Sequence, residues 1–133
     1  MPTEAEWEFA ARGGNQSVAD WNYTYAGSNT KTEVTWYDDN SNDITHEVGL
    51  KKANILGLYD MSGNVYEWCW DRYTDSISSS TPDTGVSSGF DRVKRGGAFN
   101  DDNPLSCRVV SRIRYAPDAF ATTMGFRLAR TIK

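Results

Sequence analysis

Cysteine and histidine are scarce in this sequence, which limits the metal and redox chemistry that it can support. Among 133 residues there are two cysteines, Cys69 and Cys107, and one histidine, His46. They form no CxxC motif, so a zinc or non-haem iron site with the usual ligands is not expected. We expect buried thiols or one structural disulfide rather than catalytic cysteines, and two cysteines do not reveal the compartment.

Long apolar runs and clusters of positive charge are also missing. No stretch approaches the roughly 20 apolar residues that span a bilayer. The N-terminus, Met1–Glu4, lacks the basic and apolar regions of a signal peptide. The formal net charge of −4 argues against nucleic-acid binding, which requires clustered lysine and arginine. We therefore expect a soluble chain, folded as a single domain over residues 1–133, with no membrane span and no nucleic-acid partner.

The segment from Phe99 to Thr123 lacks lysine, glutamate, glutamine, methionine and tryptophan, although all of them occur elsewhere in the chain. These residue types cannot arise from the asparagine codons AAC and AAT by changing only the adenines, whereas the types present in the segment can. Two motifs, Arg92–Gly97 and Met124–Leu128, flank it. We interpret the segment as one diversified surface on a fixed scaffold.

One helix is predicted over residues 2–12. Thr3 and Glu6 have the spacing of a capping box, a run of good helix formers follows, and Gly13 and Gly14 provide the stop. Residues 15–42 are rich in turn-forming side chains, so we expect irregular chain held by aromatic core residues. Those aromatic residues are Trp21, Tyr23, Tyr25 and Trp36.

Several short strands are predicted after this irregular region. Alternating β-branched and aromatic residues indicate a strand at Val65–Asp71. Further strands are expected at His46–Gly49, Arg92–Phe99, Cys107–Arg112 and Thr123–Arg130, and a surface loop at Thr74–Gly89. One short helix with many short strands and a high loop fraction is typical of an α+β domain.

Four motifs, in matching order, resemble those of the formylglycine-generating enzyme, or sulfatase-modifying factor, superfamily. Gly57–Trp68 resembles its GLYDMxGNVWEW signature, Pro2–Glu8 its LPTEAEWE helix, Arg95–Phe99 its RGGSW strand and Gly125–Arg127 its closing GFR. The resemblance covers nearly the whole chain but only about the C-terminal half of a family domain. It implies the C-type lectin fold of the formylglycine-generating type, with a small twisted antiparallel sheet, few helices and long loops.

The turn within the first motif could hold a structural calcium ion. In the family's enzymes the matching turn is similar to a calcium-binding loop, and here Asp60 and Asn64 supply oxygen atoms at short spacing. Alternatively, both side chains hydrogen-bond the turn itself. No other cofactor is expected.

The family's enzymes bind copper through two cysteines that follow the RGGS strand, and this chain lacks them there. The corresponding stretch, Asn100–Ser106, contains no cysteine, and Cys107 stands alone beyond it. Cu(I) requires two such thiolates placed together. The iron-dependent sulfoxide synthases of the same superfamily carry a histidine triad that is also absent, and Ser111 and His46 show no triad spacing. We therefore expect no enzymatic activity.

The diversified segment resembles the variable regions of proteins that retroelements diversify by mutating adenines. The match is good at Arg95–Gly97, Cys107–Val109, Arg112, Pro117–Asp118 and Gly125–Arg127. Ala98 and Phe99 replace the commoner Ser-Trp or Ser-Phe, which keeps the aromatic residue. In such proteins the C-type lectin fold presents variable side chains on one face to bind a ligand.

The predicted ligand-binding residues lie in three parts of this segment. They are Asp101, Asp102, Asn103, Leu105, Ser106, Ile113, Arg114, Tyr115, Ala116, Ala119, Phe120, Thr122 and Thr123. Tyr115 and Phe120 would be aromatic anchors and Arg114 a hydrogen-bonding hot spot. Alternatively, Ile113, Phe120 and Leu105 are ordinary core residues. Arg108 and Arg112 are expected to pair with acidic groups of the fold.

These features predict a monomeric, non-enzymatic display protein that binds a macromolecular ligand. We expect this ligand to be a protein. The rival interpretation is a degenerate or accessory member of the formylglycine-generating family, with another activity or a sugar-binding role. Sugar binding is disfavoured because the EPN or QPD tripeptide with a following WND, which marks calcium-dependent lectin sites, is absent. The ligand itself is not encoded in any recognisable pattern.

Overall fold

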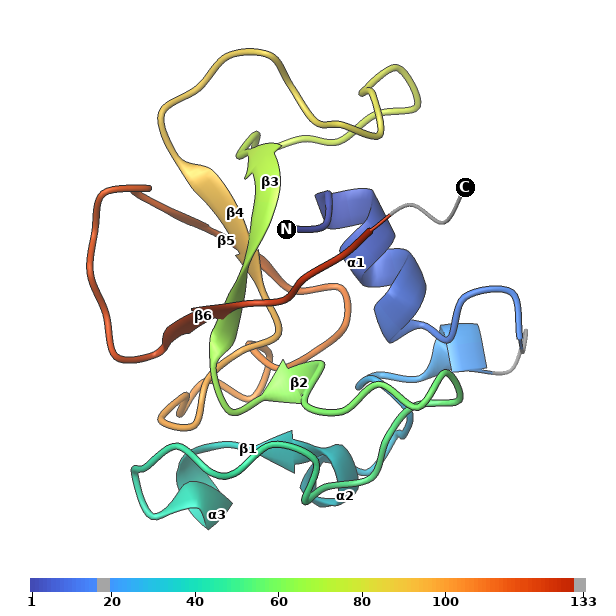
Figure 1. Cartoon of the computed structure of the whole chain (residues 1–133), viewed down its shortest axis with the longest axis vertical. Helices are drawn as coiled ribbons and strands as arrows, with labels where there is room; N and C mark the ends of the chain where they lie inside the picture. The colour runs from blue at the N-terminus through green and yellow to red at the C-terminus, as the bar shows by residue number, and fades with distance from the viewer. Residues whose placement is uncertain (17–19, 131–133) are drawn as a thin grey trace.

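A computed structural model describes residues 1–16 and 20–130 of the chain. Short helices and strands alternate along it in an α+β arrangement (Figure 1). The elements are α1 (Glu4–Ala11), η1 (Asp20–Asn22), α2 (Lys31–Val34), β1 (Thr35–Trp36), α3 (Asp38–Ser41), β2 (Ser62–Gly63), β3 (Tyr66–Arg72), β4 (Arg92–Arg95), β5 (Arg112–Tyr115) and β6 (Met124–Phe126). In this part of the chain no helix is long and apolar enough to cross a bilayer.

Helix α1 forms where the capping box predicts it. The Thr3 hydroxyl accepts a hydrogen bond from the Glu6 backbone N–H at 3.2 Å, and the Glu6 carboxylate accepts one from the Thr3 N–H at 2.8 Å. Two orphan donors of the first turn are thus satisfied. After the helix, Gly13 and Gly14 adopt positive φ angles of 96° and 61°, which end it. The prediction of this helix is confirmed.

A four-stranded sheet in the order β5-β4-β3-β6 forms the centre of the molecule. β3 pairs antiparallel with β4, and β4 antiparallel with β5, whereas β6 runs parallel to β3, so the sheet is mixed. β1 and β2 make a separate two-stranded parallel sheet. Since β5 and β6 occupy opposite edges, residues 116–123 connect one edge of the large sheet to the other.

The alternation of side chains gives the large sheet two different faces. On the face that we call the inner face, Cys69 and Val93 pack with Trp7 of α1, whose side chain is 1% exposed, and with Val109. Both cysteines are buried free thiols, so the buried-thiol alternative holds and the disulfide does not. Burial raises the pKa of both, that of Cys107 to about 12.

The strand at Val65–Asp71 is confirmed as β3, but other predicted strands are shorter or absent. β4 ends at Arg95 because Gly96 and Gly97 adopt φ angles of 96° and 81°. A Cβ at Gly97 would lie 2.6 Å from the Cys107 Sγ, so the turn also needs glycine for space. Residues 107–110 form turns rather than a strand, and residues 46–49 form no strand.

The aromatic residues of the irregular region differ in how deeply they are buried. Tyr25 is buried, as predicted, and contacts the core cluster around Val34. Trp36 is half-buried and stacks on His46 with ring centroids 3.7 Å apart. Tyr23 is also half-buried, whereas Trp21 is exposed, so the prediction of a core position is wrong for Trp21.

Candidate ligand-binding surface

The second face of the sheet, which we call the outer face, has aromatic and cationic side chains. Its residues share the even positions of β3 and β4 and the odd positions of β5, as the strand register requires. They include Tyr66, Trp68, Trp70, Arg92, Lys94, Ile113 and Tyr115. Helix α1 packs on the inner face, and the chain between β5 and β6 projects from the opposite side of the sheet (Figure 1).

Lys94 lies at the centre of the outer face between two tyrosine rings. Its Nζ is 3.7 Å from the ring centroid of Tyr66 and 4.6 Å from that of Tyr115. The ring of Trp68 lies 6.0 Å from that of Tyr115. Burial lowers the pKa of Lys94, and the charge of nearby Asp101 opposes that effect. The ammonium group and the rings therefore hold one another in place.

Burial also raises the pKa of Tyr66 above the usual tyrosine value, so its hydroxyl is neutral at physiological pH. Ser106 and Asp101 lie beside it. This contact connects the outer face to the turn that follows β4. The predicted variable residues of that turn therefore adjoin those of β5 on one side of the molecule.

Most of the predicted ligand-binding residues are exposed or partly exposed. Phe120 is 91% exposed, which rules out the alternative of a core position for it, and Leu105 is exposed as well. Ile113 is half-buried in β5, between the two alternatives. The other exposed residues are Asp102, Asn103, Arg114 and Thr122, and the other partly exposed ones are Asp101, Tyr115, Ala116, Ala119 and Thr123.

Ser106 departs from this pattern, because it is only 6% exposed. It lies next to Cys107 in the turn beneath Tyr66, so a ligand could not reach it. Asp101 and Asn103 also shape this turn. The Asp101 carboxylate accepts a hydrogen bond from the Ala98 N–H at 2.7 Å, and the Asn103 side chain accepts one from the Leu105 N–H at 2.9 Å. The prediction of exposure is thus wrong for Ser106.

The two arginines expected to be structural behave differently. Arg112 donates two hydrogen bonds of 2.7 Å to the Glu4 carboxylate, which raises the pKa of Arg112. It therefore joins the sheet to α1, as predicted. Arg108 is exposed, and its side chain has no acidic partner among residues 1–16 and 20–130, so the same expectation fails for it.

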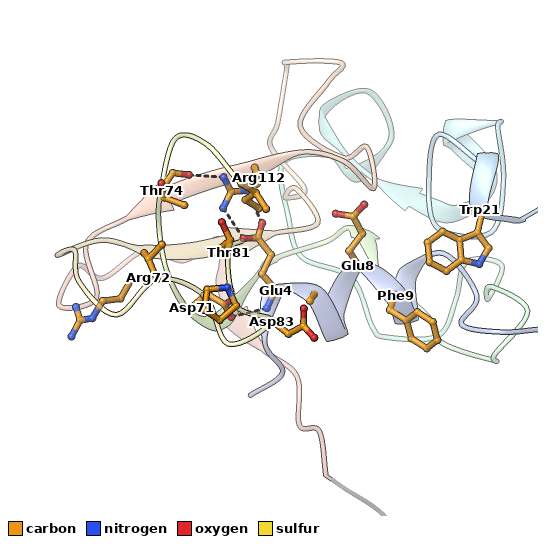
Figure 2. A pocket seen from close by; sticks show the side chains of 15 residues that line it. Glu4, Glu8, Phe9, Trp21, Asp71, Arg72, Thr74, Thr81, Asp83 and Arg112 are labelled. Carbon is orange, nitrogen blue, oxygen red and sulfur yellow. Dashed lines mark hydrogen bonds and ion pairs between the residues drawn. The ribbon is translucent and has the colours of Figure 1, made fainter. Parts of the chain in front are cut away.

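The inner face also has a cavity of about 370 Å³, between α1 and residues 74–86 (Figure 2). Glu4, Asp71 and Arg112 line it, together with Phe9 and Trp21. Besides the ion pair between Glu4 and Arg112, the Asp71 carboxylate accepts a hydrogen bond of 2.7 Å from the Glu4 N–H. Burial raises the pKa of Asp71. These charged groups hold α1 against the sheet.

The turn around Asp60 and Asn64 uses most of its side-chain oxygen and nitrogen atoms internally. The Asn64 side chain accepts from the His46 N–H and donates to the His46 carbonyl, both at 3.0 Å. One oxygen of Asp60 accepts from the Gly49 N–H at 2.8 Å, and the other is buried without a partner. One free carboxylate oxygen falls short of the six to eight ligands that calcium takes. The pair alone does not fit calcium, and calcium binding stays a prediction.

Sequence comparisons place these features in a known family. Residues 1–132 match the sulfatase-modifying factor enzyme 1-like domain. The chain belongs to this family. It is 40% identical over 116 residues to the chaperone protein LppX of Paenibacillus barcinonensis, covering 74% of this chain and 38% of that protein. It is 32% identical over 142 residues to the formylglycine-generating enzyme of Mus musculus, covering 97% of this chain and 38% of the enzyme.

Among solved structures, variable protein 1 of Treponema denticola is similar to this member of the family. The two share 41% sequence identity with a TM-score of 0.83, over 95% of this chain and 45% of the other. The fold is therefore the C-type lectin fold of the formylglycine-generating type. The chain spans less than half the length of each of these three relatives.

Several outer-face residues were missed by the sequence analysis. Tyr66, Trp68, Trp70, Arg92 and Lys94 lie outside the restricted segment, so its composition did not reveal them. The alternation within β3 was a usable signal, because it places three aromatic residues on one face. Which face stays open was not readable from that alternation, since it depends on where α1 packs.

Proposed function

We propose that this chain is a non-enzymatic ligand-binding protein whose outer face is diversified to recognise a macromolecular ligand, specifically a protein. One observation carries the proposal. Within a segment of restricted composition, Ile113 and Tyr115 of β5 and the connection to β6 lie on the side of the sheet away from α1, and the turn after β4 adjoins them through Tyr66. The similarity to a protein named as variable supports it.

The outer face has the chemistry of a protein-binding surface. Tyr115 is held by Lys94 and Trp68, so a ligand would meet a ring that has already lost its freedom. Phe120 stands out from the connection between β5 and β6 and offers a large apolar contact. Short polar residues of the same segment, such as Asn103 and Thr122, supply adaptable hydrogen bonds, whereas Arg114 lies opposite Val93 and so faces the other side of β5. The outer face thus combines fixed side chains of the scaffold strands with variable side chains of the loops.

The rival function, an accessory activity of the formylglycine-generating kind, has less support in these residues. Asn100–Ser106 contains no cysteine where the enzymes place their copper ligands. The thiol of Cys107 is fully buried, and its raised pKa keeps it protonated, whereas copper requires a thiolate. We therefore propose that the family scaffold serves binding here.

Sequencing this coding region and the neighbouring DNA across a natural population tests the proposal. We expect substitutions confined to adenine-derived codons between Asn100 and Thr123, with a near-identical template repeat nearby. The codons of inner-face residues such as Val93 and Cys69 are the internal control and should stay constant. A uniform sequence in the segment, with no template repeat, would return the chain to the accessory members of the family.

A binding experiment tests the ligand class separately. Libraries with adenine-derived codons at the exposed positions of the segment would be displayed and selected against a panel of unrelated folded proteins. We expect binders from this library and far fewer from a matched library on exposed residues of α1 and α2, which lie elsewhere. Equal yields from the two libraries would contradict a dedicated binding surface.

A further inference from the structure

A cavity of about 700 Å³ opens beside β3 and β4, between these strands and residues 82–88. We call it the arginine pocket. It is lined by Trp70, Arg72, Pro82, Thr84, Gly85, Val86, Ser87, Ser88 and Arg92. The two arginines are its only charged residues, although acidic residues outnumber basic ones by 18 to 14 in the whole chain.

The two guanidinium groups come from directly opposed positions. Arg72 and Arg92 are register partners in the antiparallel pairing of β3 with β4, and a bulge in β3 separates this pair from the regular ladder. Like charges directly opposite each other across two strands are destabilising. A carboxylate of the protein or an anion from outside would offset this repulsion.

No carboxylate in the described part of the chain lies within ion-pair distance of either arginine. Among residues 1–16 and 20–130, the ion pairs of arginine involve other arginines, and neither Arg72 nor Arg92 takes part in one. Each instead donates to a backbone carbonyl, Arg72 to that of Gly89 and Arg92 to that of Trp70. A guanidinium has five N–H donors, so donors remain on both groups.

The rest of the wall suits a polar anionic ligand. Thr84, Ser87 and Ser88 are exposed and supply hydroxyls that donate or accept hydrogen bonds. The indole of Trp70 is 55% exposed, and the Arg92 guanidinium lies 4.9 Å from its ring centroid. An isolated bridge between Arg72 and Val86 fixes the loop against β3, so the pocket has a defined wall.

We propose that the arginine pocket binds a ligand through an oxyanion, a carboxylate or sulfate group held by Arg72 and Arg92, while Trp70 contacts the rest of the ligand. Planar guanidinium groups match the geometry of such oxyanions. The ligand is larger than a single inorganic ion, because the cavity has the size of a small-molecule site. The site does not depend on diversification of residues 99–123, although Arg92 pairs with Tyr115 in the sheet.

Titration of the intact chain with anions tests this site, with the change in intrinsic tryptophan fluorescence as the readout. The probes are sodium sulfate and a sulfated disaccharide, each compared with sodium chloride at equal ionic strength. A response to sulfate beyond that to chloride shows that the free ion binds. A response to the disaccharide alone shows that the acidic group must be part of a larger ligand. Both support the proposal, whereas responses equal to chloride overturn it.

Three variants and one control make the assignment specific. Arg72→Gln and Arg92→Gln should each weaken the response at least tenfold, whereas Arg130→Gln, which removes an exposed arginine outside the pocket, should leave it unchanged. Trp70→Phe should remove the fluorescence change and so identifies its source.

The thermal midpoint separates a binding role from a structural one. Without anions, Arg92→Gln should have an equal or higher midpoint than the parent, because it relieves the repulsion with Arg72. With sulfate or the disaccharide, only the parent should gain stability. Loss of stability in the anion-free Arg92→Gln variant, with the anion response retained, would show that the arginines serve the fold instead.

Discussion

On the inner face of the sheet, arginines contact aromatic rings and also pair with carboxylates, whereas Lys94 and Arg92 on the outer face contact aromatic rings and form no ion pair within the described residues. Glu4 binds Arg112 and lies 3.5 Å from Arg95, and Glu67 binds Arg127 at 2.7 Å. Lys94, in contrast, lies between two tyrosine rings. Removal of one member of a buried ion pair costs about 3 to 5 kcal/mol, whereas a cation on an aromatic ring contributes about 0.5 to 2 kcal/mol. The same strands thus present a fixed side and an adaptable side.

The strongest test of this contrast is the removal of one tryptophan from each side. Trp7→Ala should lower the free energy of unfolding by about 3 to 5 kcal/mol, because it opens a cavity in the core and removes the 2.8 Å hydrogen bond to Glu67. Trp70→Ala, on the outer face, should cost less than about 1 kcal/mol. Denaturant unfolding of both variants measures the difference, and equal losses would erase the distinction between the faces.

Removal of one carboxylate from each kind of pair should give the next largest effect. Glu4→Gln leaves the Arg112 guanidinium without its carboxylate partner and Arg95 with Glu8 alone, and it should cost about 3 kcal/mol. The control is Asp91→Asn, which removes the exposed pair with Arg114 at 3.9 Å and should cost less than about 0.5 kcal/mol. Chemical denaturation gives both values. A small loss for Glu4→Gln would mean that the inner ion pairs do not hold α1.

The buried thiol of Cys107 should make stability depend on pH in the alkaline range. Folding raises its pKa from 9.0 to about 12, so the unfolded chain loses this proton first as pH rises. The contribution of Cys107 is therefore complete below pH 9 and is lost between about pH 9 and 12. The free energy of unfolding, measured from pH 8 to 11, should fall less steeply in Cys107→Ala than in the parent. Parallel curves would contradict this.

The smallest effect on stability is expected from the exposed variable residues. Changing Arg114, Phe120 and Thr122 together to serine should cost less than about 1 kcal/mol, because none of them is buried. Ser106→Tyr is the control within the same segment, and it should cost about 1 to 3 kcal/mol because Ser106 is enclosed. Thermal unfolding compares the two. A large loss in the triple variant would place these residues in the fold rather than on a free surface.

Local chemistry was enough to predict α1 and β3. A capping box and a pair of glycines act within a few residues, and alternation in β3 reports directly on its two faces. The strand predicted at Cys107–Arg112 does not form over residues 107–110, because contacts with distant residues decide the conformation there. Val109 and Val110 have strand-forming side chains, but Val109 is buried against the core and its N–H donates to the distant carbonyl of Thr24.

The sequence indicated which segment to consider as the candidate site, but it did not indicate which individual residues are accessible or which other residues pack beside them. Codon restriction singled out residues 99–123, and most of the named positions are accessible. Ser106 and Arg108 were misplaced because burial in a turn and the choice of an ion-pair partner depend on residues far along the chain. Arg112, for example, finds Glu4 across 108 positions. Tyr66, Trp68 and Lys94 lie beneath or beside the variable residues of the outer face through strand pairing, which no local pattern specifies.

The placement of β5 and β6 at opposite edges of the sheet limits how short the chain between them can be. From Tyr115 to Met124 the connection must cross three strand spacings and return along the strands, a diagonal of roughly 20 Å. Its nine steps reach about 30 Å when extended. A deletion of four residues would leave a reach of roughly 17 Å, too little to close the gap without unpairing a strand. Residues 116–123 can therefore change in identity, but the segment cannot lose four residues and still join β5 to β6.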